Sequence, residues 1–455
     1  MSEPPEDLVE LAGWGRTPWS ATHLSRPSTA EELGKAAHEA GPRGAITRGL
    51  GRCYGDAAQR AGGLVVDATG VSGVLDFDEE AGTVRALAGT SLDDLLREIV
   101  PRGWFVKTTP GTRFVTIGGM IASDVHGKNH HADGAFGMHV QSMALARPDG
   151  SLRTLTPADT PDEFWSTCGG MGLTGSIVEA TLALRPIESS RLLVDTDRVH
   201  DLDDLLARLL DGQRRHRYSV AWIDLLAKGR SLGRSVLTQG DFAPRSALAG
   251  RAALDPLAYG PRPPMPVPAA PAGLLNRVTA GMFNEFWFRK APRQRRAEVQ
   301  SIPYFFHPLD MVAGWNKLYG PRGFVQWQCL LPFGEEHVLR RCIEALSQHR
   351  ATSFLAVLKT MGAADPAPLS FPSPGWTLAL DVPAGSTEVS ALLRQLDREV
   401  ADAGGRIYLA KDSHLSPDLV PVMYPRLDEW RSVRDRLDPD GRCVSDLAER
   451  LRLLG

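Results

Sequence analysis

The first two fifths of the chain alternate short apolar runs with turns that contain glycine. Between Ile46 and Pro186, only a few segments show the three- and four-residue spacing of an amphipathic helix. This pattern is typical of an α+β region. The predicted elements are strands at 63–67 and 83–88, a helix capped by Ser91 and Asp94, a hairpin over 138–156 that turns at Asp149–Gly150, and a helix that begins at Thr160 and Pro161 with Glu163 completing a capping box.

After Pro186 the pattern changes to longer apolar segments that alternate between strand and helix periods. Helices are predicted at 201–210, 335–348 and 388–403, and strands at 218–226, 324–331, 354–360 and 377–382. Elements in this order favour a mostly antiparallel sheet backed by helices. The segment Asp241–Leu275 contains eight prolines, each of which fixes φ and removes a backbone donor, so regular structure is not expected there.

Composition narrows the class of protein. The 455 residues suffice for two or three domains, and no apolar run approaches the roughly 20 residues of a membrane span. The net charge of -3 provides no global positive field for nucleic acid. Five cysteines without a CxxC pair argue against a disulfide framework and a zinc ribbon. The N-terminus is acidic and lacks the apolar stretch of a cleaved signal, so we expect a cytoplasmic protein.

Three glycine-rich segments carry the strongest chemical signal: Arg48–Asp56, Pro110–His131 and Cys168–Ile177. Glycine allows a backbone to approach a phosphate closely, because it has no side chain and tolerates positive φ. Taken singly, each segment could be a structural turn. The first is not the dinucleotide GxGxxG, because no crossover helix is predicted after it. Together the three segments predict a large phosphate-bearing cofactor in extended contact with the backbone.

Four histidines in and after the second segment raise the alternative of a metal site: His126, His130, His131 and His139. Adjacent histidines on an extended segment point to opposite sides, and no carboxylate pattern completes a ligand set. We therefore expect no metal, and interpret His130 and His139 as core or surface histidines.

The amino-acid sequences of these segments resemble those of the FAD-binding superfamily of vanillyl alcohol oxidase and p-cresol methylhydroxylase. The resemblance is strongest to its decaprenylphosphoryl-β-D-ribose oxidase family, which acts in actinobacterial cell-wall synthesis. It covers the chain from about Trp14 onward and rests on RGLGRCYGDAAQ, PGTRFVTIGGMIASDVHGKNHHADGAFGMHV, GGMGLTG, FFHPLDMVAGWNKLYGPRGFVQWQ, PLSFPSPGW, YLAKDS and MYPRLDEW. It implies an FAD-binding domain over 1–190, a substrate domain with an antiparallel sheet over 191–405, and a return to the first domain over 406–455.

The resemblance also implies how FAD is held. Many relatives tether the flavin through a histidine where this chain has Arg52, and a guanidinium cannot form that bond, so non-covalent FAD is expected. The residues expected to hold the cofactor are Arg48, Gly49, Gly51, Arg52, Cys53, Tyr54, Gly55, Thr109, Gly111, Thr112, Gly118, Gly119, Ala122, Ser123, His126, Gly127, Asn129, Gly172, Thr174, Gly175, Ile177 and Lys411.

Two glutamines on one predicted strand suggest where a sugar would bind. Gln326 and Gln328 are two residues apart, so their amides project from one face, roughly 7 Å apart. Lys359 is costly to bury unpaired, so it either reaches an anion such as a substrate phosphate or lies at an exposed edge. The resemblance adds Lys128, Tyr319, Thr377 and Ala379 to the substrate residues. The related oxidases commonly have asparagine and cysteine at the last two positions, which leaves the exact substrate open.

Three residues are candidates for catalysis. The resemblance places Lys411, at the end of a short strand after Gly404–Gly405, beside flavin and substrate, where its charge would stabilise the reduced flavin. Removal of a hydride from an alcohol carbon also requires a base for the hydroxyl proton. His126, Tyr408 and Lys411 are all candidates for that base.

The implied activity is FAD-dependent oxidation of the 2'-hydroxyl of a polyprenylphosphoryl ribose, after which an NADH-dependent short-chain reductase completes epimerisation. The alternatives are an FAD-linked aldose or alditol oxidase on a soluble sugar, and a flavin-free binding protein. The proline-rich segment is predicted to be mobile and to act as a lid for a lipid tail or as a contact with the bilayer. Its apolar residues are Leu248, Leu254, Leu257, Met265, Val267 and Leu274.

Overall fold

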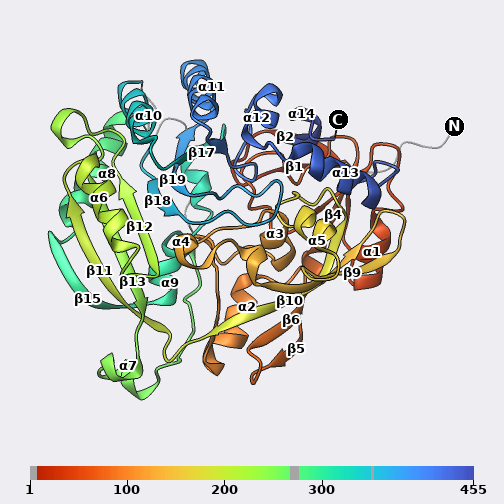
Figure 1. Cartoon of the computed structure of the whole chain (residues 1–455), viewed down its shortest axis with the longest axis horizontal. Helices are drawn as coiled ribbons and strands as arrows, with labels where there is room; N and C mark the ends of the chain where they lie inside the picture. Colours follow the sequence, from red (N-terminus) through yellow and green to blue (C-terminus); the bar gives the residue numbers. More distant parts are fainter. Residues whose placement is uncertain (1–7, 267–275, 350–352, 455) are drawn as a thin grey trace.

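The described residues form three large β-sheets, one two-stranded sheet, and helices packed on and between the large sheets (Figure 1). The computed structural model describes residues 8–266, 276–349 and 353–454. The N-terminal half of the chain builds the two smaller of the three large sheets, and the largest sheet comes from residues 191–407. The α+β class predicted from the sequence is confirmed.

The smallest of the three large sheets has four strands in the order β1-β2-β4-β3. Its strands are β1 (Val9–Ala12), β2 (Trp19–Ser25), β3 (Ala45–Arg48) and β4 (Leu64–Asp67), and helix α1 (Ala30–Ala36) connects β2 to β3. Strand β4 pairs in parallel with both β2 and β3. Residues 49–63, which join β3 to β4, contain no helix, so the first glycine segment is a loop and not part of a Rossmann crossover.

The second sheet is antiparallel and is centred on the long strand β10 (Ser176–Pro186). Its other strands are β5 (Val74–Asp78), β6 (Thr83–Leu87), β7 (Trp104–Val106), β8 (Val140–Ala146) and β9 (Leu152–Leu155). The hairpin predicted around Gly150 is confirmed, since Ala146 of β8 pairs with Leu152 of β9 and Gly150 has φ of 85°. Helix α2 (Leu92–Ile99) begins at Ser91, whose hydroxyl accepts from the Asp94 N–H as predicted.

Helix α5 (Pro161–Thr167) forms where it was predicted, but its capping box does not. The Thr160 hydroxyl donates to the Thr156 carbonyl, and the Glu163 carboxylate pairs with Arg153 at 2.9 Å. Arg153 of β9 thus takes the place of the backbone N–H as the partner of the Glu163 carboxylate. The two other short helices of this half are α3 (Ile117–Ala122) and α4 (His130–Asp133).

The largest sheet has eight antiparallel strands in the order β15-β11-β13-β12-β18-β19-β17-β20. They are β11 (Arg191–Val199), β12 (Tyr218–Ile223), β13 (Ser235–Phe242), β15 (Gln294–Ser301), β17 (Phe324–Pro332), β18 (Ala356–Met361), β19 (Gly375–Pro383) and β20 (Arg406–Ile407). Helices α6 (Leu202–Gly212), α10 (Glu336–Gln348) and α11 (Thr387–Asp402) contribute to one apolar core with alternate residues of the strands. The predicted helix-backed antiparallel sheet is confirmed.

That core fixes which strand residues face away from the helices. Trp327 of β17 and Leu358 of β18 belong to the helix-packed core, and the Trp327 ring N–H donates to Asp397 of α11 at 2.8 Å. Because side chains alternate along a strand, the neighbours Gln326, Gln328 and Lys359 lie on the opposite face.

The proline-rich segment contains short regular elements, contrary to the prediction. Strand β13 continues to Phe242, helix α7 covers Arg251–Leu254, and the two-residue strand β14 (Met265–Pro266) pairs in parallel with β16 (Val312–Ala313). Elements of this length fit between prolines. Leu248 is buried, whereas Leu254 and Met265 are exposed. Residues 267–275, with Val267 and Leu274, lie outside the described residues, and the mobility of the segment stays a prediction.

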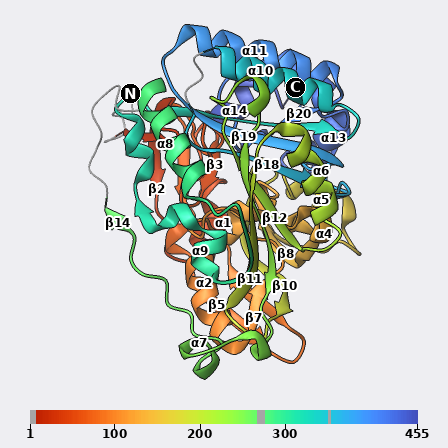
Figure 2. The same ribbon diagram turned by 90° about the vertical axis from the view of Figure 1, so that its left-hand side faces the viewer.

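The C-terminal segment returns to the four-stranded sheet (Figure 1). It contains α12 (Val420–Met423), α13 (Leu427–Leu437) and α14 (Asp446–Arg450), and Cys443 forms a parallel bridge with Ala45 of β3. The domain boundaries at 190 and 405 stay a prediction. Within the described part of the chain, no helix has the length and apolarity needed to cross a membrane. Two further helices, α8 (Arg277–Lys290) and α9 (Ile302–Phe306), lie with β14 at one margin of the molecule (Figure 2).

Candidate active site

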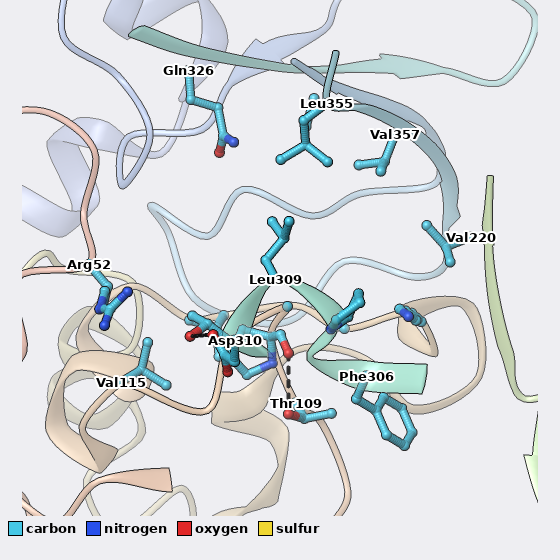
Figure 3. Close-up of a pocket in the computed structure, with 18 of the residues that line it drawn as sticks. Arg52, Thr109, Val115, Val220, Phe306, Leu309, Asp310, Gln326, Leu355 and Val357 are labelled. Carbon is cyan, nitrogen blue, oxygen red and sulfur yellow. Dashed lines mark hydrogen bonds between the residues drawn. The ribbon is translucent and has the colours of Figure 1, made fainter. Parts of the chain in front are cut away.

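A cavity of about 870 Å³ lies between the glycine-rich segments and the free face of the eight-stranded sheet. Figure 3 shows Gln326, Leu355 and Val357 approaching it from the sheet and Arg52, Val115 and Thr109 from the opposite wall. Its volume falls within the roughly 300–1,000 Å³ of ligand and cofactor pockets. The cavity thus has one wall from each half of the chain.

The first wall consists of loops that only glycine permits to approach so closely. A Cβ on Gly49 would lie 2.2 Å from the Thr116 hydroxyl, and Gly51 has φ of 63°. The backbone of loop 49–58 therefore packs directly against the Thr116 side chain, at the N-cap of α3. At Gly111 a Cβ would meet nothing within 4 Å, so this loop leaves open space on the cavity side.

Two buried nitrogen atoms on this wall have no hydrogen-bond partner among the described residues: Nε of Arg52 and Nδ1 of His126. The Arg52 guanidinium lies 3.7 Å from the centroid of the Trp14 ring, and burial lowers its pKa. Unpartnered buried donors are costly, so such groups point to a polar ligand. Glycine-lined loops, open volume and orphaned donors fit a large phosphate-bearing cofactor such as FAD.

Three adjacent strands form the second wall, and two of them, β17 and β18, present hydrogen-bonding and cationic groups. Gln326 and Gln328 of β17, Lys359 of β18 and Ala379 of β19 all line the cavity. The predicted common face of the two glutamines is confirmed. The Gln328 amide nitrogen lies 2.9 Å from Nε2 of His126 and 3.1 Å from the Thr377 hydroxyl, so this side chain bridges the two walls.

Three half-buried lysines line the cavity without a carboxylate partner. No carboxylate oxygen of the described residues lies within 4.0 Å of the ammonium group of Lys128, Lys359 or Lys411. Burial, reinforced by the charge of Lys411, lowers the pKa of Lys359 to about 8. Burial and then Lys359 lower the pKa of Lys128 to about 7. We call these three residues the lysine cluster; its uncompensated charge suits an anionic ligand.

Lys359 does not lie at a sheet edge, because β18 is hydrogen-bonded on both sides, by β12 and by β19. This rules out the exposed-edge alternative, and the binding of an anion by Lys359 stays a prediction. The Lys128 ammonium donates to the Phe305 carbonyl and lies 4.4 Å from the centroid of the Phe305 ring. Both lysines are therefore held in the cavity by the fold.

Lys411 is placed by a turn and not, as predicted, by the end of a strand. Strand β20 ends at Ile407, and Lys411 follows in a turn in which its N–H donates to the Tyr408 carbonyl. Its ammonium lies 3.9 Å from the centroid of the Tyr54 ring. Burial lowers the pKa of Lys411 to about 8, although the nearby Asp381 acts in the opposite direction.

The other two candidate bases differ in how free they are. The Tyr408 hydroxyl donates to the Ser123 carbonyl at 2.7 Å, and burial raises its pKa well above the usual value. Burial and the charge of Lys359 lower the pKa of His126 well below its ordinary value, so the ring is neutral near pH 7. A neutral imidazole can accept a proton. The Tyr408 hydroxyl, by contrast, is protonated and donates its proton in the hydrogen bond to the Ser123 carbonyl.

Asp381 is a buried carboxyl group beside this site that the sequence analysis did not single out. It lies opposite Gln326 in the β17–β19 register and accepts from the Gln326 amide at 2.5 Å. Burial raises the pKa of Asp381 to about 7, against the effects of Gln326 and Lys411. The two-residue period of β19 was the available signal, because Asp381 follows Thr377 and Ala379 on the same face.

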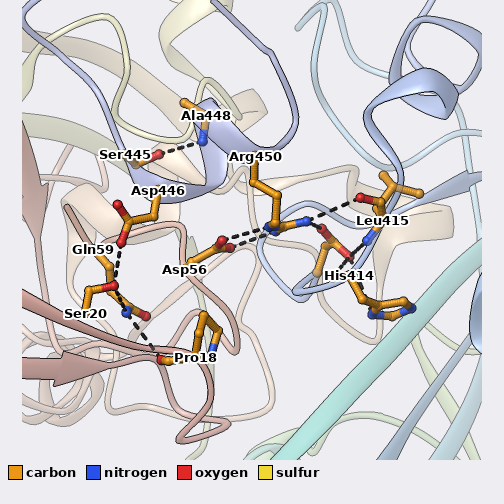
Figure 4. A network of polar contacts seen from close by, with 11 residues as sticks. Pro18, Ser20, Asp56, Gln59, His414, Leu415, Ser445, Asp446, Ala448 and Arg450 are labelled. Carbon is orange, nitrogen blue, oxygen red and sulfur yellow. Dashed lines mark hydrogen bonds and ion pairs between the residues drawn. The ribbon is translucent and has the colours of Figure 1, made fainter. Parts of the chain in front are cut away.

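An ion-pair network connects loop 49–58 to the turn that contains Lys411 (Figure 4). Arg450 of α14 makes two hydrogen bonds to the Asp56 carboxylate, at 2.7 and 2.8 Å, and a third to Asp412 at 2.8 Å. A Cβ on Gly55 would lie 2.0 Å from the Asp412 carbonyl oxygen, so the loops touch at the backbone. Asp56 and Asp412 adjoin the cavity residues in sequence, and Arg450 thereby positions Tyr54 and Lys411.

Most of the predicted cofactor residues line the cavity: Gly49, Gly51, Arg52, Cys53, Tyr54, Thr109, Gly111, Thr112, Gly119, Ala122, Ser123, His126, Gly127, Gly172 and Lys411. Nine predicted site residues do not line it: Arg48, Gly55, Gly118, Asn129, Thr174, Gly175, Ile177, Tyr319 and Thr377. Three of the nine contact residues that do line it: Arg48, Tyr319 and Thr377.

Arg48, for example, binds the carbonyls of Ala12 and Ala58, and Tyr319 stacks on Phe324 with ring centroids 4.2 Å apart. The histidines after His126 are not extended as predicted. His130 begins α4 and accepts from the Gly362 N–H, whereas His131 bonds the His216 carbonyl.

Comparisons with known proteins agree with this geometry. The family model described as FAD binding domain matches residues 21–156, and that of D-arabinono-1,4-lactone oxidase matches residues 381–451. The chain is 41% identical to decaprenylphosphoryl-β-D-ribose oxidase of Mycolicibacterium smegmatis, over 100% of this chain and 99% of the relative. It is 40% identical to an uncharacterised protein of Streptomyces coelicolor, over 80% of this chain and 100% of the relative. L-gulono-1,4-lactone dehydrogenase of Mycobacterium tuberculosis is 22% identical, over 94% and 95%.

Proposed function

The chain belongs to the decaprenylphosphoryl-β-D-ribose oxidase family of FAD-dependent oxidoreductases, and from this membership we propose that it oxidises the 2'-hydroxyl of a polyprenylphosphoryl ribose to a ketone. The observation that carries the proposal is the lysine cluster beside Gln326 and Gln328, because a sugar phosphate needs cations and hydrogen-bonding groups together. The match to an FAD-binding domain overturns the alternative of a flavin-free binding protein. Full-length identity to a ribosyl-lipid oxidase favours this substrate over a soluble aldose or alditol.

FAD supplies the hydride acceptor in this reaction, and the chain supplies binding, charge and a base. We assign the sugar hydroxyls to the amides of Gln326 and Gln328, and the phosphate to Lys359 and Lys128. Lys411 contributes a positive charge at the reacting centre, where negative charge develops. Its position over the Tyr54 ring, in a turn fixed by Arg450, holds this charge in place.

His126 is our choice for the base that takes the hydroxyl proton. Its Nε2 accepts from the Gln328 amide, so the neutral ring carries its own proton on Nδ1 and is basic at Nε2. A substrate hydroxyl that displaces the Gln328 amide from Nε2 would place its proton on the basic nitrogen. The displaced amide would then be free to bind the sugar.

Anaerobic titration of the FAD-loaded enzyme tests the proposal. A ribosyl phospholipid should bleach the visible flavin absorbance, and free alditols at the same concentration should not. Bleaching by alditols alone, or by neither compound, would contradict the proposed substrate.

We also propose that FAD is bound non-covalently, since Arg52 occupies the tethering position and stacks on Trp14. Acid precipitation of the protein should leave FAD in the supernatant, and flavin that stays with the pellet would refute this. The keto product needs a second enzyme to reduce it, and an NADH-dependent reductase is the partner that we propose. A cytoplasmic location with peripheral contact to the membrane completes the proposal.

A further inference from the structure

Helix α8 presents an apolar face to solvent. Its inward stripe is Ala280, Asn284 and Phe288, which are all buried. On the other side Val278, Met282 and Phe286, also four residues apart, are 70%, 69% and 61% exposed. A surface helix of a globular protein normally carries polar residues on its outer face. The exposed stripe therefore calls for a partner.

This face continues into the cavity. Phe283 and Trp287 of α8 line the cavity, and their rings stack with centroids 6.0 Å apart. Tyr304 of α9 and Met311 also line it and are more than one third exposed. Residues that both line a cavity and meet solvent mark its opening. Figure 2 shows α8 and α9 on the same margin of the molecule. The exposed stripe thus adjoins the entrance to the candidate active site.

A run of cations follows the apolar stripe directly. It comprises Arg289, Lys290, Arg293, Arg295 and Arg296, all exposed, at the end of α8 and the start of β15. Arg289 pairs with Glu285, Arg295 with Glu298 and Arg296 with Asp197, whereas Lys290 and Arg293 have no ion pair among the described residues. With a net charge of -3 for the whole chain, this positive patch is local. Apolar residues beside a cluster of cations are typical of a helix that lies in a membrane interface.

We propose that the α8 face, defined here as Val278, Met282, Phe286 and the following cations, docks on an anionic lipid bilayer and places the cavity entrance at the lipid surface. The role of this docking rests on the proposed function, because a substrate with a polyprenyl tail must reach the cavity from a membrane. The docking itself needs no substrate. Its failure can therefore be distinguished from failure of the proposed reaction.

Vesicle sedimentation of the FAD-loaded full chain tests the docking. The probes are phosphatidylcholine vesicles with and without phosphatidylglycerol, with no ribosyl lipid present. We expect the protein to sediment with the anionic vesicles and to be released by high salt. The double variant Met282→Ser, Phe286→Ser should bind at least tenfold more weakly, since it removes the two apolar side chains but spares the cavity lining. Arg293→Glu should weaken binding to the anionic vesicles only.

Leu152→Ser is the matched control, because Leu152 is 65% exposed on β9, away from α8. It should bind vesicles like the unchanged protein, and all variants should retain flavin absorbance and turn over a short-chain ribosyl phosphate at the same rate. The proposal fails if the unchanged protein stays in solution or if the double variant sediments equally well. It also fails if ultracentrifugation finds a dimer that the double variant converts to monomer, since the face would then bind a second copy.

Discussion

Lys411 and Asp412 are neighbours in sequence but belong to two different groups of charged side chains. The two groups differ in whether other residues of the protein neutralise their charge. In the Asp56–Arg450–Asp412 network every charge has a partner: burial acts to raise the pKa of Asp412, but Arg450, His414 and backbone donors hold it below its usual value. Lys411, the residue before Asp412, belongs to the lysine cluster. No carboxylate of the described residues pairs with any of the three lysines. The first group is neutralised within the fold, whereas for the second we propose an anion from outside as the partner.

The largest expected effect comes from breaking the paired group. Arg450→Met leaves two buried carboxylates without their cation and should lower the free energy of unfolding by about 3–5 kcal/mol, measured by denaturant titration. The contribution of Asp412 is present above its unfolded pKa and is lost as the pH falls through its lower folded value, so the variant should differ least in acid.

Lys35→Met is the control for that variant, since the Lys35–Glu31 pair is exposed to solvent and should contribute little to stability. Arg450→Lys should recover part of the stability, because it restores the charge without the two-pronged contact to Asp56. Equal stability of Arg450→Met and Lys35→Met would show that the network is not structural.

Removing a charge from the lysine cluster should affect activity and not folding. Lys411→Met should slow flavin reduction by roughly 10²–10³-fold, as expected for loss of one group that stabilises developing charge. The measurement is stopped-flow absorbance with saturating substrate. The unfolding midpoint should stay level or rise, because an unpaired buried cation is removed. Near-normal rates in a variant that binds FAD would contradict the assigned role.

The pH dependence of stability should reveal the cluster in the absence of substrate. Lys359 releases its proton at about pH 8 in the folded protein but at about 10.4 when unfolded. Between these values the unfolded chain binds more protons, so the free energy of unfolding rises with pH, by at most about 1.4 kcal/mol per pH unit for each lysine. Lys359→Met should reduce the pH dependence of the free energy of unfolding above pH 8. A bound ribosyl phosphate that keeps Lys359 protonated should have the same effect. An unchanged slope in the variant would mean that Lys359 is not desolvated.

The smallest effect is expected from a change that leaves both charged groups intact. Ala379→Cys should alter kcat/KM less than threefold, because Ala379 lines the cavity beside Gln328 but donates no hydrogen bond from its side chain. The new thiol should react with a small alkylating reagent, as mass spectrometry would detect, and substrate should protect it. Cys329 on β17, which faces the helices, should stay unlabelled and serves as the internal control. Labelling at both positions would indicate partial unfolding.

Local patterns were enough to predict much of the second wall of the cavity, which the eight-stranded sheet forms. The two-residue period of a strand placed Gln326 beside Gln328, and turn residues located the β8–β9 hairpin. For Lys359 the sequence left open an anion site or an exposed edge. Strand β15 was missed because QRRAEVQS lacks alternating apolar residues, which an edge strand facing solvent does not need. Helix α8 was missed because its apolar residues lie on more than one face.

The contacts that hold the site could not be predicted in the same way. Arg450 and Asp56 are 394 residues apart, and nothing in either local sequence indicates the other. The pairing depends on how the C-terminal segment packs on the first sheet. Similarly, the pKa values of the lysines follow from burial and mutual repulsion in the cavity, which are properties of the folded chain alone.

The distance in sequence between Asp56 and Arg450 has a consequence for how the protein is made. At translation rates of about 5–20 residues per second, the ribosome adds Arg450 roughly 20–80 s after Asp56. Throughout that interval the first glycine-rich loop lacks the cation and the backbone neighbour that fix it. The Asp56 carboxylate of the nascent chain therefore stays solvated until the end of synthesis. Capture of the flavin in its final geometry becomes a post-translational event, and an agent that holds α14 away from the first sheet would stall maturation without touching the active site.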